Sequence, residues 1–246
     1  MVVVRLLDRF VVTSGGVAMH VPASAHRLVA LLALRGSPVE RSYVSQCLWM
    51  DKTEARAYAN LRSVIWRLRR SSPQLVSLSA SHLSLRRDVE VDIDALRGLA
   101  RALVDETSAV ELSAVDAESL SGELLPGWCD DFVELERERL RQMRLHALES
   151  LSHRLLRAGR HALALDAALA AVAADPLRET AHRAVIAVHL AEGNLGEALR
   201  QFSSLADLLA RELGIAPSRR TAELLDVRSD WATGPAPRQA ARLLTI

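Results

Sequence analysis

The stretch TEARAYANLRSVIWRLRR, residues 53–70, decides the fold of the front half of this chain. Read at the helical repeat, it divides into two faces. One face is apolar and consists of Ala57, Leu61, Val64, Ile65 and Leu68. The opposite face is polar and basic and consists of Arg56, Asn60, Ser63, Arg67 and Arg70, with Arg62, Trp66 and Arg69 beside it. The stretch therefore predicts an amphipathic helix whose N-terminus is capped by Asp51 or Thr53.

The basic face carries little compensating charge, because no acidic residue follows Glu54 within the stretch. Guanidinium groups can bind guanine or phosphate, and an asparagine amide can bind adenine. Two interpretations follow: a recognition helix that lies in a DNA groove, or a solvated basic surface, which is the more frequent outcome for a run of charge. The helix alone does not decide between them, so its surroundings must.

Charge is distributed unevenly along the 246 residues, although the net charge is only +1. Residues 1–90 contain 13 basic and 6 acidic residues, a net charge of +7, and the remainder contains 18 and 24, a net charge of −6. Half of the residues are hydrophobic, which excludes a disordered chain and suffices for one large or two modest cores. A basic front and an acidic rear fit a nucleic-acid module joined to a module of another kind.

No residue pattern points to catalysis, a cofactor or a metal site. Cys47 and Cys129 lie far apart, and the histidines of the rear half occur singly along predicted helices. The acids of residues 130–138 are dense, but they stand at a helix start and alternate with arginines that can pair with them. No apolar run can span a bilayer, and the N-terminus lacks a signal-peptide pattern. We therefore expect a cytoplasmic protein that is not an enzyme, needs no cofactor or metal and does not enter the membrane.

Short elements surround the basic helix. In order, we expect a small antiparallel sheet or hairpin within residues 2–21, a helix at about 25–35, a helix at about 41–49, the basic helix, and a hairpin at residues 76–85. Ser24 can cap the first helix and Gly36 can end it. This order is that of an α+β winged helix-turn-helix, in which the last hairpin is the wing.

The residues of this region resemble a known family. LVALLALRGSPVERSYVSQCLW, followed by ANLRSVIWRLRR, is similar to the OmpR-type DNA-binding domain, and more closely to its version in the actinobacterial antibiotic regulatory proteins, the SARP family. The shared features are Leu48-Trp49 at the end of the second helix and the Arg-Leu-Arg-Arg of residues 67–70. Two features depart from the pattern: the connection at residues 50–52 has neither glycine nor proline, and the hairpin tip at residues 80–82 lacks a glycine–aromatic pair.

The resemblance implies that the middle of the basic helix enters the major groove. Within that arrangement we choose Asn60, Ser63 and Arg67 as base or near-base contacts, and Arg56, Arg62, Arg69 and Arg70 as phosphate contacts. Arg86 and Arg87, after the hairpin, are further candidates for minor-groove or backbone contact. Trp66 either packs against the sheet, the role that we favour, or lies over a sugar or a thymine methyl group.

The sequence of the C-terminal half predicts mostly helices. An acidic linker at residues 89–94 suggests a domain boundary, and helices are expected at about 93–104 and 131–158. Residues 159–165 then align with residues 193–199 at an offset of 34, the tetratricopeptide period. Small residues in both copies would let paired helices approach closely, as in an α-solenoid with a concave face for partners.

This half resembles the bacterial transcriptional activator domain (BTAD) that follows the winged helix in SARP regulators. The stretches that carry the resemblance are DDFVELERERLRQMRLHALESL, DPLRETAHRAVIAVHLAEGNLGEALRQF and RELGIAPS. The predicted domains are a winged helix at 1–90, a tetratricopeptide-like BTAD at 91–226 and a flexible tail at 227–246. The predicted fold class is mainly α.

These features predict a sequence-specific DNA-binding transcriptional regulator, an activator. The resemblance implies that it binds direct repeats in promoter DNA and that its helical domain contacts the sigma subunit of RNA polymerase or a second protomer. The alternative is a tetratricopeptide-type interaction adaptor whose degenerate winged helix no longer binds DNA, as the altered connection and hairpin tip would allow.

Overall fold

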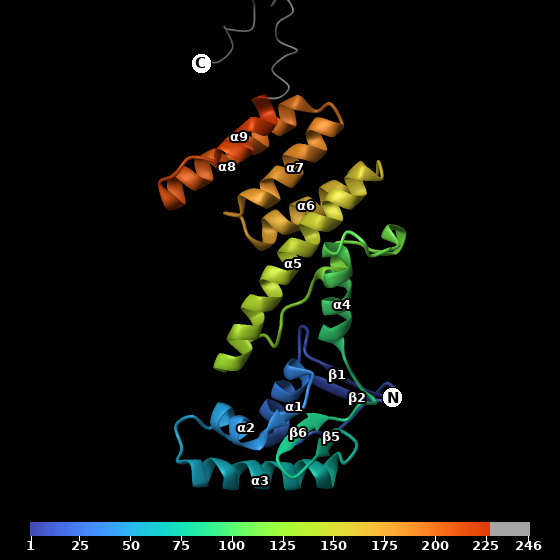
Figure 1. The fold of residues 1–246 in the computed structure, drawn as a ribbon, viewed down its shortest axis with the longest axis vertical. Coiled ribbons are helices and arrows are strands. Elements are labelled where there is room, and N and C mark those ends of the chain that lie inside the picture. Colours follow the sequence, from blue (N-terminus) through green and yellow to red (C-terminus); the bar gives the residue numbers. More distant parts are fainter. Residues whose placement is uncertain (227–246) are drawn as a thin grey trace, which may run out of the picture. The chain divides into compact units, whose positions relative to one another are not determined.

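The chain divides into two units in the computed structural model, which describes residues 1–226 (Figure 1). The first unit comprises Met1–Asp105 and Glu118–Met143, and we call it the winged-helix unit. The second comprises Glu106–Ala117 and the described residues from Arg144 onward, and we call it the helical unit. The predicted tail, residues 227–246, lies outside the described residues.

A four-stranded sheet opens the winged-helix unit, in the order β3-β2-β1-β7. Its strands are β1 (Val2–Arg5), β2 (Val11–Ser14), β3 (Val17–Ala18) and β7 (Val89–Val91). The first three are antiparallel neighbours, as their β-branched residues predict. β7 pairs in parallel with β1, so that Val2 lies opposite Val89. The interpretation of residues 89–94 as a linker is wrong, because β7 is part of the sheet and α4 (Asp92–Val104) follows it directly.

Three helices and a second sheet follow in the predicted order. They are α1 (Ala23–Arg35), α2 (Arg41–Leu48), α3 (Glu54–Ser71) and a sheet with the spatial order β4 (Val39–Glu40), β6 (His82–Leu85) and β5 (Val76–Leu78). α1 supplies buried leucines to the core on most of its sides, and Gly36 ends it in the left-handed conformation, at φ 63°. The helix begins after Pro22 without a side-chain cap, so the predicted capping by Ser24 is wrong.

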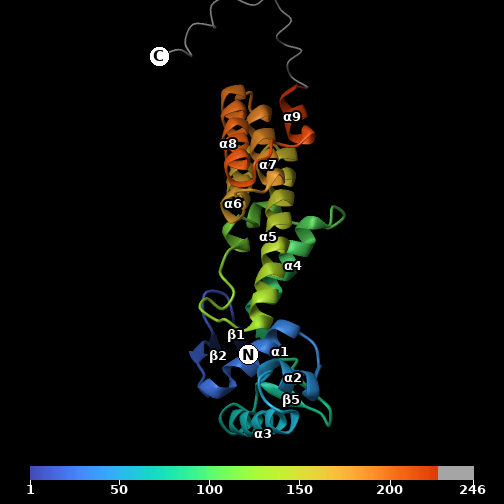
Figure 2. The same cartoon turned by 90° about the vertical axis from the view of Figure 1, so that its left-hand side faces the viewer.

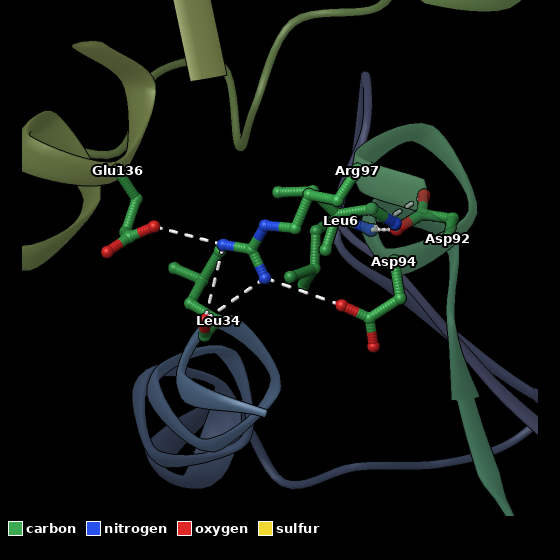
Figure 3. A network of polar contacts seen from close by, with 7 residues as sticks. Leu6, Leu34, Asp92, Asp94, Arg97 and Glu136 are labelled. Atoms are coloured by element: carbon green, nitrogen blue, oxygen red, sulfur yellow. Dashed lines mark hydrogen bonds and ion pairs between the residues drawn. The ribbon is translucent and has the colours of Figure 1, made fainter. Parts of the chain in front are cut away.

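A polar network joins α4 and the first half of α5 (Asp131–Arg157) to the rest of the winged-helix unit (Figure 3). The carboxylate of Asp92 accepts a hydrogen bond of 2.9 Å from the backbone N–H of Leu6, at the end of β1. Arg97 on α4 donates to the carbonyl oxygen of Leu34 on α1 and forms an ion pair of 3.0 Å with Glu136 on α5. The side chains of Arg97 and Glu136 are largely buried, and Arg97 ties α4 to α5 through the ion pair and to α1 through the hydrogen bond.

The helical unit shows the predicted 34-residue repeat. Its remaining helices are α6 (His161–Ala174), α7 (Glu179–Ala191), α8 (Leu195–Leu213) and α9 (Arg219–Asp226). Gly159 and Gly193, which correspond in the repeat, adopt left-handed conformations at φ 70° and 81°, after α5 and α7 respectively. α7 packs against both α6 and α8, and the buried alanines of α6 permit a close approach. Among the helices of residues 1–226, none is long and apolar enough to span a bilayer.

Candidate nucleic-acid interface

α3 is anchored to the winged-helix unit by the apolar face that its sequence predicts. The buried residues of the helix are Ala57, Leu61, Val64, Ile65 and Leu68. Thr53 occupies the N-cap position, but its side chain makes no capping hydrogen bond. α1, α2 and the β5–β6 hairpin all lie on one side of α3, as Figure 1 and Figure 2 both show. The opposite side of the helix is therefore open to solvent.

The open side carries the arginines. Arg56, Arg62, Arg67, Arg69 and Arg70 are all exposed. Within residues 1–226, none of these five forms an ion pair with an acidic side chain, and the one side-chain hydrogen bond of Arg67 is a long contact of 3.5 Å to Ser24. The positive charge of α3 is thus left uncompensated by the protein, which is the arrangement that binding of an anionic polymer requires.

Trp66 lies on the same open side, with 61% of its surface exposed. The favoured prediction, that it packs against the sheet, is therefore wrong. The physical reason is its helical position: Ile65 and Leu68 fill the core-facing stripe, so the indole one step round the helix points away from it. The guanidinium of Arg70 lies over the indole ring, 5.5 Å from its centroid, which is a cation–π contact.

Two hollows flank α3 and divide most of the predicted site residues of this helix between them. One, of about 430 Å³, brings together Asn60, Ser63 and Arg67 with Ser24 and Arg27 of α1. The other, of about 520 Å³, brings together Arg62, Trp66, Arg69 and Arg70 with Arg41 of α2. The predicted base contacts thus lie on the α1 side of the helix, and three of the four predicted phosphate contacts lie on the hairpin side.

The hairpin does not present its arginines at its tip. Arg86 and Arg87 follow β6, at the end of the hairpin opposite the turn, and Arg86 forms an ion pair of 3.0 Å with Asp88. The tip itself is tied down, because the carbonyl oxygen of Ser81 accepts a hydrogen bond of 2.8 Å from the backbone N–H of Arg41. A hollow along the hairpin brings Arg86 and Arg87 together with Arg69 of α3, but with no other predicted site residue of that helix.

A comparison with protein families identifies the family of the helical part of this chain. The sequence profile of the bacterial transcriptional activator domain matches residues 91–226, more than half of the chain. The chain belongs to the bacterial transcriptional activator domain family. The resemblance to SARP-type regulators, stated above from sequence motifs, is confirmed.

Relatives of this BTAD protein are named as regulatory proteins. It is 29% identical over 220 residues to the regulatory protein AfsR of Streptomyces griseus, covering 82% of this chain but only 22% of that relative. It is 29% identical over 246 residues to the regulatory protein DnrI of Streptomyces peucetius, covering 90% of this chain and 89% of DnrI. The chain thus spans about a fifth of AfsR and most of DnrI.

A solved structure shares the fold of this BTAD protein. The structure of Mycobacterium tuberculosis EmbR in complex with a low-affinity phosphopeptide matches with a TM-score of 0.75 at 20% identity, covering 92% of this chain and 64% of that one. At this identity the match concerns the fold alone. It confirms the predicted fold class, a mainly α chain with a small sheet region in front and a helical domain behind.

Arg41 lines the hollow beside Trp66, and sequence reasoning missed it. It begins α2 and lies in no run of basic residues, so periodicity cannot single it out. It reaches the hollow beside Trp66 only because β4 pairs with β6 and fixes the start of α2 against the hairpin. Elsewhere in the described part of the chain, no group of three or more histidine, cysteine or acidic side chains is placed to hold a metal ion.

Proposed function

We propose that this chain is a DNA-binding transcriptional activator that inserts α3 into the major groove. The observation that carries the proposal is the exposed arginine face of α3, which no carboxylate in residues 1–226 neutralises. A helix of this kind, fixed by an apolar stripe to a small core, matches the recognition helix of winged helix-turn-helix domains. Such a regulator would act in the cytoplasm, where the chromosome lies.

In this proposal the two sides of α3 have different tasks. Asn60, Ser63 and Arg67 face base edges, where an amide can pair with adenine and a guanidinium with guanine. Arg56, Arg62, Arg69 and Arg70 contact phosphates, which fix the position of the helix without reading sequence. Arg86 and Arg87 remain candidates for a weaker backbone contact, since Arg86 is already paired with Asp88.

The partners of the helical unit follow from the family. Resemblance to SARP regulators supports binding to direct repeats in promoter DNA, and contacts of the helical unit with the sigma subunit of RNA polymerase or with a second protomer. The relatives AfsR and DnrI are named regulatory proteins, which supports a regulatory role for this chain. The chain corresponds to about a fifth of AfsR, and to most of DnrI.

The proposal is tested by binding of the full chain to genomic DNA. Fragments retained by the tagged protein are sequenced, and the enriched site is used in a fluorescence anisotropy titration. Asn60→Ala with Arg67→Ala should weaken binding roughly 30-fold or more, since each good base contact contributes about 1–3 kcal/mol. Arg141→Ala is the matched control, because Arg141 is a helical arginine already paired with Glu138.

Two outcomes would reject the proposal. One is that the wild-type chain enriches no fragment and binds no duplex even at low salt, which would favour the interaction adaptor. The other is that the double variant binds the enriched site as tightly as the Arg141→Ala control does.

A further inference from the structure

The hollow on the hairpin side of α3 has features that a groove-reading helix does not require. We call it the arginine pocket and define it by Arg41, Arg62, Trp66, Arg69 and Arg70, with Ile65 and Leu78 forming its apolar floor. Its side chains come from α2, α3 and β5. Four guanidinium groups thus meet around one exposed indole.

The arginine pocket contains no acidic residue in its lining. Arg62, Arg69 and Arg70 form no ion pair within residues 1–226, so like charges gather here without a counter-charge from the protein. Gathering like charges is unfavourable unless an anion joins them. The pocket is therefore suited to an anionic group supplied from outside.

Arg41 gives this pocket a donor that already lacks an acceptor. Its Nε is shielded from solvent, and in the described part of the chain it has no hydrogen-bond partner. Its backbone N–H is held by the carbonyl oxygen of Ser81, so the residue cannot move away with the start of α2. Shielded donors without an acceptor are rare in folded proteins, so the guanidinium of Arg41 keeps hydrogen-bonding capacity that the described part of the chain does not use.

Trp66 supplies the apolar part of the site. The indole is exposed beside the arginines, and the guanidinium of Arg70 covers one part of its ring. An anion with an adjoining non-polar ring can use both features, since guanidinium groups bind phosphate oxygens and an indole packs against sugar carbons. A deoxyribose phosphate has this chemistry.

We propose that the arginine pocket seats a backbone phosphate of the DNA strand that borders the major groove, with Trp66 against the adjoining deoxyribose. This inference rests on the proposed function. If α3 lies in the major groove, a strand backbone passes between the helix and the hairpin, where the pocket lies. The hairpin tip has no arginine and is tied to Arg41, so the pocket takes over the positioning that a basic wing tip would provide.

The pocket then contributes affinity and register but no sequence preference. Loss of Arg41 should weaken binding to every duplex by a similar factor and reduce the dependence on salt by one phosphate contact. Loss of the Trp66 indole should weaken binding without changing the salt dependence, because the indole carries no charge. These two signatures separate the charged part of the pocket from its apolar part.

The experiment measures anisotropy of a mixed-sequence duplex of about 30 bp with the full chain, at salt concentrations from about 50 to 200 mM. Arg41→Gln should make the slope of log K against log salt shallower by about 0.9. Trp66→Ala should lower affinity roughly fivefold at an unchanged slope. Arg101→Gln, on the exposed side of α4, is the control that removes the same charge elsewhere in the winged-helix unit.

Arg62→Gln and Arg70→Gln keep the test valid if Arg41→Gln fails to fold, because both side chains are exposed and their loss leaves the core intact. Each should make the slope shallower by about 0.9 as well. Circular dichroism melts identify any variant that is unfolded.

Inorganic phosphate and a single-stranded oligonucleotide are then added separately as competitors of the duplex, because both carry phosphate groups. The proposal predicts that neither competes with the duplex at equal phosphate concentration. Competition by inorganic phosphate that is lost in Arg41→Gln would identify a free-phosphate site and overturn the proposal.

The failure of this inference differs from the failure of the proposed function. If the wild-type chain binds no duplex, the proposed function fails. If the duplex binds and Arg67→Ala weakens it, but the arginine-pocket variants behave like Arg101→Gln, only the pocket assignment is wrong.

Discussion

α3 and the first half of α5 are both rich in arginine, but they use it in opposite ways. On α5, Arg137, Arg139 and Arg141 form ion pairs with Glu134, Glu136 and Glu138, each three residues earlier in the helix. On α3, the arginines follow one acid, Glu54, at the helix start. The spacing of the acids therefore decides which helix keeps its charge for an outside partner.

The effect of pairing is visible at Glu138 on α5. Hydrogen bonds from Arg141 and Gln142 lower the pKa of Glu138 from 4.5 to about 2. Arg141 is thus matched by a carboxylate that stays ionised at neutral pH. The exposed arginines of α3 have no such carboxylate partner, so their positive electrostatic potential extends into solvent.

The largest effect is expected when α3 is given the pattern of α5. Ser63→Glu with Trp66→Glu places carboxylates within three or four residues of Arg67, Arg69 and Arg70. Affinity for duplex DNA should fall roughly 1,000-fold, because new ion pairs and repulsion replace phosphate contacts. Fluorescence anisotropy measures the affinity of this double variant for duplex DNA. The control for net charge is a second double variant, Ser203→Glu with Ser204→Glu, at exposed positions of α8. Equal affinity of the two double variants would show that α3 is not the contact.

A smaller effect is expected at an arginine that serves the fold. Arg97→Ala leaves the buried Glu136 without one of its two ion-pair partners and frees the carbonyl oxygen of Leu34. The free energy of unfolding should fall by about 2–3 kcal/mol, measured by urea denaturation of the full chain. Arg101→Ala, the exposed neighbour on α4, should change it by less than about 0.5 kcal/mol. A change in Arg97→Ala no larger than that of the neighbour would contradict the role of the network.

Arg141→Ala should have little effect on either property. The ion pair with Glu138 is exposed, and exposed pairs contribute about 0–1 kcal/mol. Thermal melts and anisotropy of the same sample measure both properties. A loss of DNA affinity comparable to that of Arg67→Ala would mean that a paired arginine can also serve the interface.

The smallest effect concerns pH. Because the pKa of Glu138 is lower in the folded chain than its ordinary value of 4.5, its stabilising contribution is complete above about pH 4.5 and is lost as pH falls toward 2. Glu138→Gln should therefore reduce the difference in stability between pH 7 and pH 3.5. Urea denaturation at the two pH values measures it, and an unchanged difference would show that Glu138 is not held by Arg141 in solution.

The sequence predicted α3 well because one local rule governs it. Its apolar residues recur at helical spacing, and the structure places the helix within a residue of the expected bounds. The pairing of acids with arginines on α5 was predictable for the same reason, since both partners lie in one helix. The assignment of Trp66 to the core failed because its apolar character was weighed above its position on the helix.

Features that depend on distant pairing could not be predicted. β7 looked like an acidic linker because its partner, β1, lies more than eighty residues earlier, with Val2 opposite Val89. The same limit hid Arg41, whose place beside Trp66 depends on the pairing of β4 with β6. Periodicity finds faces of single helices, but it cannot find a pocket that two helices and a strand form together.

The salt dependence of duplex binding tests the central claim most directly. Phosphate contacts from Arg41, Arg56, Arg62, Arg69 and Arg70 predict a slope of log K against log salt of about −4.5 for each bound protomer. Arg67→Ala should weaken binding while the slope stays nearly the same, since it is assigned to bases. A slope near zero for the wild-type chain, or no binding at low salt, would contradict the assignment of α3 to DNA.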